Sequence, residues 1–172
     1  MTPWKKIRAV TFDIDGVMTD GGLIPMESGE FLRIFNAKDS FALRAAAMKG
    51  YKLGVFTGGK SLGILNRMLS AGLKEEDIYM NCRGKISSWE DFCRRHGLKP
   101  EEVLYVGDDI PDLQIMRAAG IGVAPFDAAD DVIEEADYIC DKGGGKGCIR
   151  EVIEKMMTKA GCWNFDDFEK IF

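Results

Sequence analysis

The sequence predicts an α/β fold in which a doubly wound parallel sheet carries helices on both faces. Short apolar runs at residues 7–12, 52–56 and 103–106 are each followed by a few polar residues and then by a helix-like stretch. This alternation is typical of βαβ units, which build parallel sheets. No linker rich in proline or serine interrupts the 172 residues, so we expect one domain over residues 1–172.

The expected helices have recognisable ends. Gly50, Gly72 and Gly120 each follow a periodic apolar segment, where glycine commonly ends a helix, and Pro111 stands in the first turn of another. In chain order we expect a strand at 7–12, a helix at 39–49, a strand at 52–56, a helix at 60–71, a short strand near 78–79, a helix at 85–96, a strand at 103–106, a helix at 111–119, a strand at 121–124, a helix at 128–135, a strand at 137–140, a helix at 147–159 and an amphipathic turn at 164–171.

Residues 20–36 interrupt the step from the first strand to the first helix. Two apolar stretches flank a polar turn at residues 27–30, which predicts a β-hairpin insertion. An isolated hairpin is marginally stable in water, so its apolar side chains need cover from an oligomer or, alternatively, from their own domain. These side chains are Leu23, Ile24, Phe31, Ile34 and Phe35.

The composition is that of a globular protein without a basic character. Apolar residues make up 46% of the chain, and the formal net charge is −5. Nucleic-acid binders carry a basic patch or stripe, so we expect no nucleic-acid partner. The first residues contain only a short apolar strand, which is shorter than a signal or membrane segment requires. We therefore expect no membrane partner and a cytoplasmic location.

Cysteine and histidine offer little for catalysis or metal binding. The five cysteines are odd in number and lack Cys-x-x-Cys spacing, which favours reduced structural thiols over disulfides or a zinc site. His96 is the single histidine and precedes Gly97 at an expected helix end, where a cation suits the helix dipole. We therefore expect no histidine-based catalytic triad.

Asp13 and Asp15 form the most informative pair of residues. They stand two residues apart after the first apolar run, so in a strand both side chains point to the same side. The carboxyl ends of strands in open α/β sheets are where ligands bind. The alternative is a simple turn around Gly16, since Asp-Gly often opens turns. The pair alone does not decide between a reaction centre and a turn.

Polar residues that follow later strands favour the reaction centre. Thr57 and Gly58 follow the run at 52–56, Asp108 follows the run at 103–106, and Lys85 stands between them after Gly84. Because the carboxyl ends of parallel strands meet at one edge of a sheet, we expect carboxylates, a hydroxyl and an ammonium to converge there.

These motifs, in this order, resemble those of the haloacid dehalogenase phosphatase superfamily, which implies a Rossmann-like fold. Residues 13–20, Thr57-Gly58, Lys85 and residues 107–112 match its four motifs. Residues 35–39, 107–109 and 143–151 resemble the small subfamily without a cap domain that includes 3-deoxy-D-manno-octulosonate 8-phosphate (Kdo-8-phosphate) phosphatase. The resemblance implies a phosphoric monoester hydrolase of lipopolysaccharide biosynthesis that acts through an aspartyl-phosphate. It also implies homotetramers that assemble through the hairpin.

The resemblance also implies catalytic roles. Asp13 would be the nucleophile, and Asp15 would protonate the leaving sugar oxygen and later activate water. Thr57 and the amide of Gly58 would hold the phosphoryl oxygens. An aspartate that attacks a phosphate ester meets like charge, so the ammonium of Lys85 is needed to neutralise the reactants.

A divalent cation is expected for the same electrostatic reason. The resemblance gives its protein ligands as Asp13, the backbone carbonyl of Asp15, and Asp108. Oxygen ligands without a nearby imidazole or thiolate favour Mg²⁺. Asp109 and Asp112 could orient Lys85 or metal-bound water, or they could simply be acidic residues at a helix N-terminus. Both alternatives stay open.

Substrate recognition is implied by a further set of residues. In the resembled subfamily, two arginines and one loop meet a sugar acid and its carboxylate, and arginine can bind both carboxylate oxygens. Without the resemblance, arginines at such helical positions would be ordinary solvated residues. The matching arginines are Arg44 and Arg67, and the matching loop is Asn36, Ala37, Lys38, Asp39 and Ser40.

One departure concerns the choice of sugar. Kdo-8-phosphate phosphatases often carry arginine after Thr-Gly, whereas this chain has Gly59 followed by Lys60. Lys60 could replace the missing guanidinium as a point charge. A related phosphatase of a nine-carbon keto-deoxy sugar acid (KDN 9-phosphate type) carries glutamate there, which Gly59 does not match. We therefore expect the eight-carbon ester first and keep the nine-carbon ester as the alternative.

Two other functions compete with the phosphatase. A phospho-receiver signalling domain also combines acidic residues, a hydroxyl and a lysine on a doubly wound sheet. Receivers place the acidic pair on the first strand and the acceptor on the third, whereas here Asp-x-Asp comes first and the second acidic pair follows Lys85. A catalytically idle scaffold is disfavoured because all four motif positions are filled.

Overall fold

A six-stranded parallel sheet organises the computed structural model, which describes residues 3–166. The strands lie in the order β5-β4-β1-β6-β7-β8, and every neighbouring pair is parallel. The α/β fold predicted from the sequence is therefore confirmed. Their bounds are β1 (Ala9–Phe12), β4 (Lys52–Phe56), β5 (Ile78–Tyr79), β6 (Val103–Val106), β7 (Ile121–Ala124) and β8 (Tyr138–Ile139).

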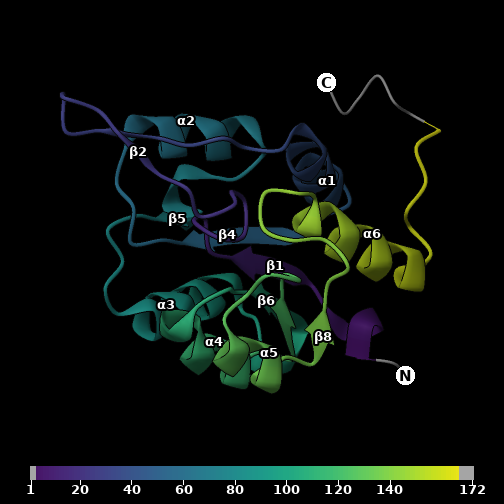
Figure 1. The fold of residues 1–172 in the computed structure, drawn as a ribbon. Coiled ribbons are helices and arrows are strands. Elements are labelled where there is room, and N and C mark those ends of the chain that lie inside the picture. The colour runs from purple at the N-terminus through teal and green to yellow at the C-terminus, as the bar shows by residue number, and fades with distance from the viewer. Residues whose placement is uncertain (1–2, 167–172) are drawn as a thin grey trace.

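Helices cover both faces of this sheet (Figure 1). One face carries α1 (Ala37–Met48), α2 (Leu62–Ser70) and α6 (Cys148–Ala160). The other carries α3 (Lys85–His96), α4 (Leu113–Ala118) and α5 (Asp130–Glu135). Because of this double cover, every residue of β1, β6 and β7 is buried, as parallel sheets require. The described part of the chain also contains four short 3₁₀ turns: η1 (Pro3–Lys6), η2 (Glu75–Asp77), η3 (Pro100–Glu102) and η4 (Ile110–Asp112).

Five helix starts within residues 3–166 differ from the sequence prediction by one or two residues: α1, α2, α4, α5 and α6. Two of these shifts follow from the local structure. The helix expected from residue 60 begins at Leu62 because the Ser61 side chain accepts the Ile64 amide at 3.2 Å and caps it. The helix expected from residue 111 begins at Leu113, after the 3₁₀ turn η4. The amphipathic turn expected at 164–171 lies mostly outside the described residues. All five cysteines are free.

The predicted hairpin is present and projects beyond the helical layer. Strands β2 (Ile24–Pro25) and β3 (Phe31–Leu32) pair antiparallel, and Figure 1 shows them extending past α2. Ile24 and Ile34 are 58% and 80% exposed. Phe35 instead packs against the core, so the alternative of cover from the same domain holds for that residue only. Among the described residues, no helix combines the length and apolarity that a membrane crossing requires.

Asp39 links α1 to α6, which pack side by side (Figure 1). Its side chain is fully buried, and its Oδ1 accepts the backbone amide of Arg150 at 2.8 Å. Its Oδ2 is buried and has no hydrogen-bond partner among residues 3–166. Burial raises the pKa of Asp39 to about 6, against the lowering effects of the amide bond and charge of Arg150. Asp39 therefore serves the junction between the two helices.

We expect Asp39→Asn to stabilise the protein in alkaline but not in acidic solution. The folded-state pKa, about 6, lies above the ordinary value of 3.8. The folded protein therefore binds more protons than the unfolded chain between these values, and the wild type loses stability as the pH rises through them. Asparagine removes this loss, which amounts to at most about 3 kcal/mol. Urea denaturation at about pH 4 and about pH 8 measures it.

Asp141→Asn is the matched control because Asp141 is an exposed aspartate near the same helix. Its difference from wild type should be the same at both pH values. A pH-independent difference for Asp39→Asn would contradict the role assigned to burial.

Candidate active site

The two acidic motifs, one containing Asp13 and the other containing Asp108, meet at the point where the sheet reverses its strand order. The chain runs from β1 outward to β4 and β5, then returns to β6 on the other side of β1 and continues to β7 and β8. Open α/β sheets bind ligands at such a switch point. Asp13 directly follows β1 and Asp108 stands two residues beyond β6, and the Asp13 amide donates to the carbonyl of Val106 at 3.1 Å.

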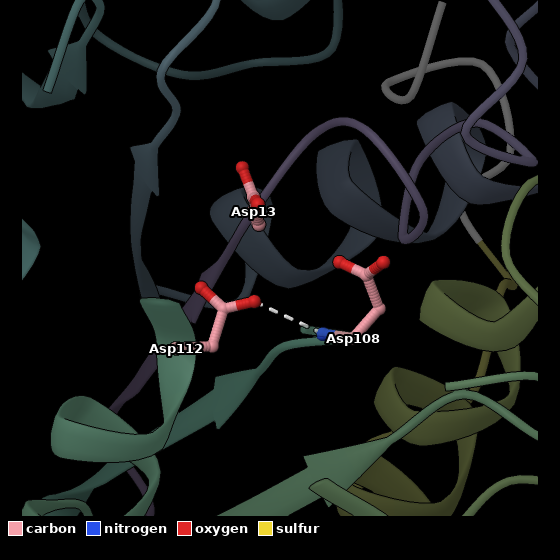
Figure 2. A group of neighbouring side chains, drawn as sticks. All are labelled: Asp13, Asp108 and Asp112. Carbon is pink, nitrogen blue, oxygen red and sulfur yellow. Dashed lines mark hydrogen bonds between the residues drawn. The ribbon is translucent and has the colours of Figure 1, made fainter. Parts of the chain in front are cut away.

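Asp13, Asp108 and Asp112 form one acidic cluster at this point (Figure 2). One carboxylate oxygen from each lies within 4.8 Å of the others. Figure 2 shows Asp13 above, at the end of its strand, with Asp112 below it on the left and Asp108 on the right. The structure therefore brings together two of the predicted metal ligands and one residue with an open role.

Lys85 lies inside the acidic cluster. This buried side chain comes from the first residue of α3, and its Nζ donates to Asp13 Oδ2 at 2.7 Å and to Asp112 Oδ1 at 2.8 Å. The neighbouring carboxylates hold the pKa of Lys85 above its ordinary value, although burial alone would lower it. Lys85 is therefore a fixed positive charge beside the oxygen atoms of Asp13.

Asp112 has all of its acceptor positions engaged by the protein. Oδ1 accepts from Lys85 and from the Tyr105 hydroxyl at 2.6 Å, and Oδ2 accepts the amides of Asp108 and Asp109 at 3.0 and 3.3 Å. Of the two roles left open by the sequence, this geometry favours the one that orients Lys85. Asp109 is exposed and accepts the amide of Ile110 at 2.8 Å, which fits the helix-terminal alternative. Tyr105 was not predicted as a site residue, since strand β6 reads only as apolar.

Within the described residues, Lys85 contacts Asp13 and Asp112 but forms no ion pair with Asp108. Its Oδ1 is buried and has no hydrogen-bond partner within the described part of the chain. Burial raises its pKa to about 7, and the charges of Asp112, Asp13 and Asp109 add to the effect. Burial and Asp112 also raise the pKa of Asp13 to about 6, despite the opposing effect of Lys85. One ammonium therefore does not neutralise the cluster, and its geometry suits an added cation.

Gly16 allows the loop after β1 to pass close to Asp108. Its φ is +89°, and a Cβ there would lie 1.9 Å from Asp108 Oδ2. Glycine is thus required twice, for the backbone conformation and for space. The Asp-Gly turn is present and lies beside the acidic cluster, so the two alternatives from the sequence are compatible.

Asp15 is held by a residue that the sequence did not predict. Arg33, which follows β3 of the hairpin, donates from Nε to Oδ1 at 2.7 Å and from Nη2 to Oδ2 at 3.0 Å. The side chain of Arg33 is 7% exposed and that of Asp15 is 28% exposed. Eighteen residues and a hairpin separate the two, so no helical or strand periodicity relates them.

Thr57, Gly58 and Gly59 form an open loop after β4. The Thr57 hydroxyl is buried and accepts the Gly59 amide at 3.1 Å. Gly58 has free space where a Cβ would stand, which leaves its backbone accessible to a ligand. Lys60 is exposed next to this loop.

The predicted substrate residues are distributed over several places. Asn36 caps α1, since its Oδ1 accepts the Lys38 amide at 2.9 Å. Ala37 and Lys38 are exposed in the first turn, whereas Asp39 and Ser40 are buried. Lys38 also lines a basic cavity of about 500 Å³ with Lys142, Lys146 and Arg150.

The two predicted arginines lie along the helical layer. Arg44 donates from Nε to the carbonyl of Ser70 at 2.6 Å, at the end of α2 that points away from the carboxyl edge of the sheet. Arg67 lies against Phe35, with its guanidinium carbon 6.0 Å from the ring centre. Arg67 and Arg33 both line a cavity of about 300 Å³ between the hairpin and α2. Within this chain, Arg44 does not join the acidic cluster.

Comparisons with known proteins identify the family of this chain. Residues 62–151 match the haloacid dehalogenase-like hydrolase family. The 3-deoxy-D-manno-octulosonate 8-phosphate phosphatase of Salmonella typhi is 32% identical over 161 residues, which cover 94% of this chain and 85% of that protein. The corresponding enzyme of Escherichia coli K12 is 32% identical and covers 91% and 82%.

Solved structures give the same result. The 3-deoxy-D-manno-octulosonate 8-phosphate phosphatase of Yersinia pestis superposes with a TM-score of 0.90 at 28% identity, covering 93% of this chain and 85% of that one. That of Moraxella catarrhalis, solved with magnesium, phosphate and KDO, has a TM-score of 0.89 at 29% identity and covers 98% and 94%. The family match covers more than half of this chain, and the relative from Salmonella typhi matches most of both chains. The chain therefore belongs to the haloacid dehalogenase-like hydrolases.

Proposed function

We propose that this chain is a Mg²⁺-dependent phosphatase that hydrolyses 3-deoxy-D-manno-octulosonate 8-phosphate to Kdo and phosphate in lipopolysaccharide biosynthesis. The observation that carries the proposal is the approach of Asp13 and Asp108 at the switch point, with Lys85 on Asp13. Relatives with this enzyme name match nearly the whole chain, and a structural neighbour was solved with the magnesium, phosphate and KDO that such a reaction involves.

Asp13 is the proposed nucleophile. The amide of Ile14 donates to its Oδ1 at 2.7 Å and Lys85 donates to its Oδ2 at 2.7 Å, so the carboxylate has one fixed orientation. Attack on phosphorus forms an aspartyl-phosphate and releases the sugar alcohol, and water then cleaves the aspartyl-phosphate. Lys85 reduces the repulsion between the carboxylate and the phosphate dianion.

The residues at the switch point fit Mg²⁺. The Oδ1 of Asp108 is buried and has no partner among residues 3–166, and burial raises the pKa values of Asp13 and Asp108. Both properties suit a pair of carboxylates that binds a cation. Asp13, Asp108 and the backbone carbonyl of Asp15 would hold the ion, all through the oxygen atoms that Mg²⁺ prefers. Asp112 would not bind it directly, because four donors already engage its oxygens. The bound ion supplies charge neutralisation at the transferring phosphoryl group.

Substrate contacts lie on the loops around this centre. We assign the phosphoryl oxygens to the Thr57 hydroxyl and the exposed amide of Gly58, and proton transfer to Asp15. The sugar and its carboxylate are assigned to Asn36, Ala37 and Lys38 of the loop 36–40 and to Arg44, Arg67 and Lys60, whereas Asp39 and Ser40 are buried and are withdrawn from this set. Because Arg44 does not join the acidic cluster in its own chain, its assigned contact requires a neighbouring subunit.

We assign this assembly to the hairpin, as a homotetramer. Ile24, Phe31 and Leu32 are 58%, 47% and 52% exposed on its two strands, and an apolar surface of this kind is stabilised when another subunit covers it. Sedimentation of the purified protein tests the subunit number directly.

Asp13→Asn should abolish phosphate release. The amide cannot attack phosphorus, so we expect the rate on Kdo-8-phosphate and on p-nitrophenyl phosphate to fall at least about a thousand-fold. Steady-state assays with and without Mg²⁺ measure it, and Asp131→Asn, at an exposed aspartate of α5, is the control. Wild-type protein that turns over no ester with Mg²⁺ would refute the phosphatase, and a stable phosphoryl-aspartate without turnover would indicate the receiver domain.

Gly16→Ala should weaken Mg²⁺ binding. The new Cβ would displace the Asp108 carboxylate, whereas Gly29 has a similar φ of +85° and free space where its Cβ would stand. Gly29→Ala therefore repeats the backbone strain without the displacement. We expect about a ten-fold loss of affinity, or about 1.4 kcal/mol, for Gly16→Ala alone in calorimetric titration with Mg²⁺. Equal affinities for the two variants would remove Asp108 from the metal site.

Lys60→Ala tests the recognition of the sugar. If Lys60 contacts the sugar acid, the apparent affinity for Kdo-8-phosphate should fall about ten-fold while p-nitrophenyl phosphate is affected little. The same comparison with the nine-carbon ester shows which sugar acid is preferred. Equal losses on the sugar and the aryl ester would contradict a contact with the sugar.

A further inference from the structure

We propose that Arg33, a residue of the hairpin insertion, is a positioning residue that fixes the carboxylate of Asp15 for proton transfer to the leaving oxygen. The inference rests on the proposed phosphatase reaction. It also gives the hairpin a role within the active site of its own chain, in addition to any role in assembly.

The contact has the geometry of a fixed clamp. Nε and Nη2 of Arg33 each donate to a different oxygen of Asp15, at 2.7 and 3.0 Å. Nη1 donates at 3.5 Å to the carbonyl of Phe31, in the hairpin strand just before Arg33. A two-point contact between a guanidinium and a carboxylate sets the plane of the carboxylate as well as its distance. With 7% of the Arg33 side chain exposed, little solvent competes for these donors.

Asp15 has no other such support. Asp13 is oriented by an amide and an ammonium, and Asp112 by four donors. Over residues 3–166, the hydrogen bonds to the Asp15 carboxylate come from Arg33. Without this clamp, a carboxylate that is 28% exposed could rotate toward solvent.

Gly59 gives Arg33 the space it occupies. A Cβ on Gly59 would lie 3.1 Å from Arg33 Nη2, 2.8 Å from Ile64 Cδ1 and 3.3 Å from Thr57 Oγ1. A side chain at position 59 would therefore crowd the guanidinium. The same distances place Nη2, which donates to Asp15 Oδ2, beside the loop assigned to the phosphoryl group.

The step that depends on the clamp is the first half of the reaction. As Asp13 forms its bond to phosphorus, the bond from phosphorus to the ester oxygen breaks, and the proton of Asp15 moves to that oxygen to give the alcohol. Asp15 is then a carboxylate, which takes a proton from the water that cleaves the aspartyl-phosphate. Acid assistance matters most when the leaving group is a poor one.

Leaving-group dependence therefore tests the proposal. Phenyl phosphate and p-nitrophenyl phosphate have similar shapes, but p-nitrophenolate departs readily without a proton. The value of kcat/KM reports steps up to release of the alcohol. For Arg33→Met we expect the fold-decrease in kcat/KM on phenyl phosphate to be at least about ten times the fold-decrease on p-nitrophenyl phosphate. Arg33→Lys keeps the charge but not the two-point contact. We expect it and Gly59→Ala to lower the ratio of kcat/KM on phenyl phosphate to kcat/KM on p-nitrophenyl phosphate, each by less than Arg33→Met does.

The matched control is Arg117→Met. Arg117 on α4 makes the same kind of two-point contact with Glu135, at 3.1 and 2.8 Å, on the opposite face of the sheet. Its variant should keep the wild-type ratio. Thermal unfolding identifies a variant that fails to fold, and in that case Arg33→Lys and Gly59→Ala decide the question.

The outcomes separate this proposal from the proposed function. Suppose the wild type hydrolyses both esters and Arg33→Met lowers kcat/KM equally on both, or on neither. This result would overturn the role of Arg33 and leave the phosphatase intact. A wild type that hydrolyses neither ester with Mg²⁺ would overturn both. A selective loss on phenyl phosphate would establish the clamp.

Discussion

The contact of Lys85 with both Asp13 and Asp112 is the interaction on which the site depends. Three buried or half-buried carboxylates lie around one ammonium, and burial makes each uncompensated charge costly. Asp112 converts this arrangement into a fixed geometry, because it binds Lys85, Tyr105 and the amides of residues 108 and 109 at once. Asp112 therefore acts on Asp13 through Lys85, and directly on the turn that carries Asp108.

Sheet topology supplies the rest of the geometry. Because β1 lies between β4 and β6, the loops that follow these three strands lie next to one another and bring Asp13, Thr57 and Asp108 to one edge. The loop after β1 carries the hairpin insertion, and all three loops follow strands that are covered on both faces. The fold thus delivers a nucleophile, a hydroxyl and a metal ligand from segments that are far apart in the chain.

Two features could be predicted from the sequence: the strands, which follow from the local apolar pattern, and the approach of the acidic motifs, which follows from a general rule of sheet topology. Apolar runs predicted the strands, and the rule that parallel strands share a carboxyl edge predicted that Asp13 and Asp108 would approach. The pairing of Asp15 with Arg33 could not be predicted, since the tilt of an inserted hairpin is decided by packing and not by periodicity. Asp39 illustrates the opposite difficulty: a polar residue in a helix-starting loop looks available to substrate, yet α6 covers it.

The hairpin carries both an exposed apolar surface and the arginine that contacts Asp15. Its exposed apolar side chains make it an obvious segment to delete when a smaller protein with less tendency to associate is wanted. Arg33 stands at the base of the same segment and reaches Asp15. A shortened loop would therefore keep the contact with Asp15 only if its new connection returned the Arg33 guanidinium to the same place.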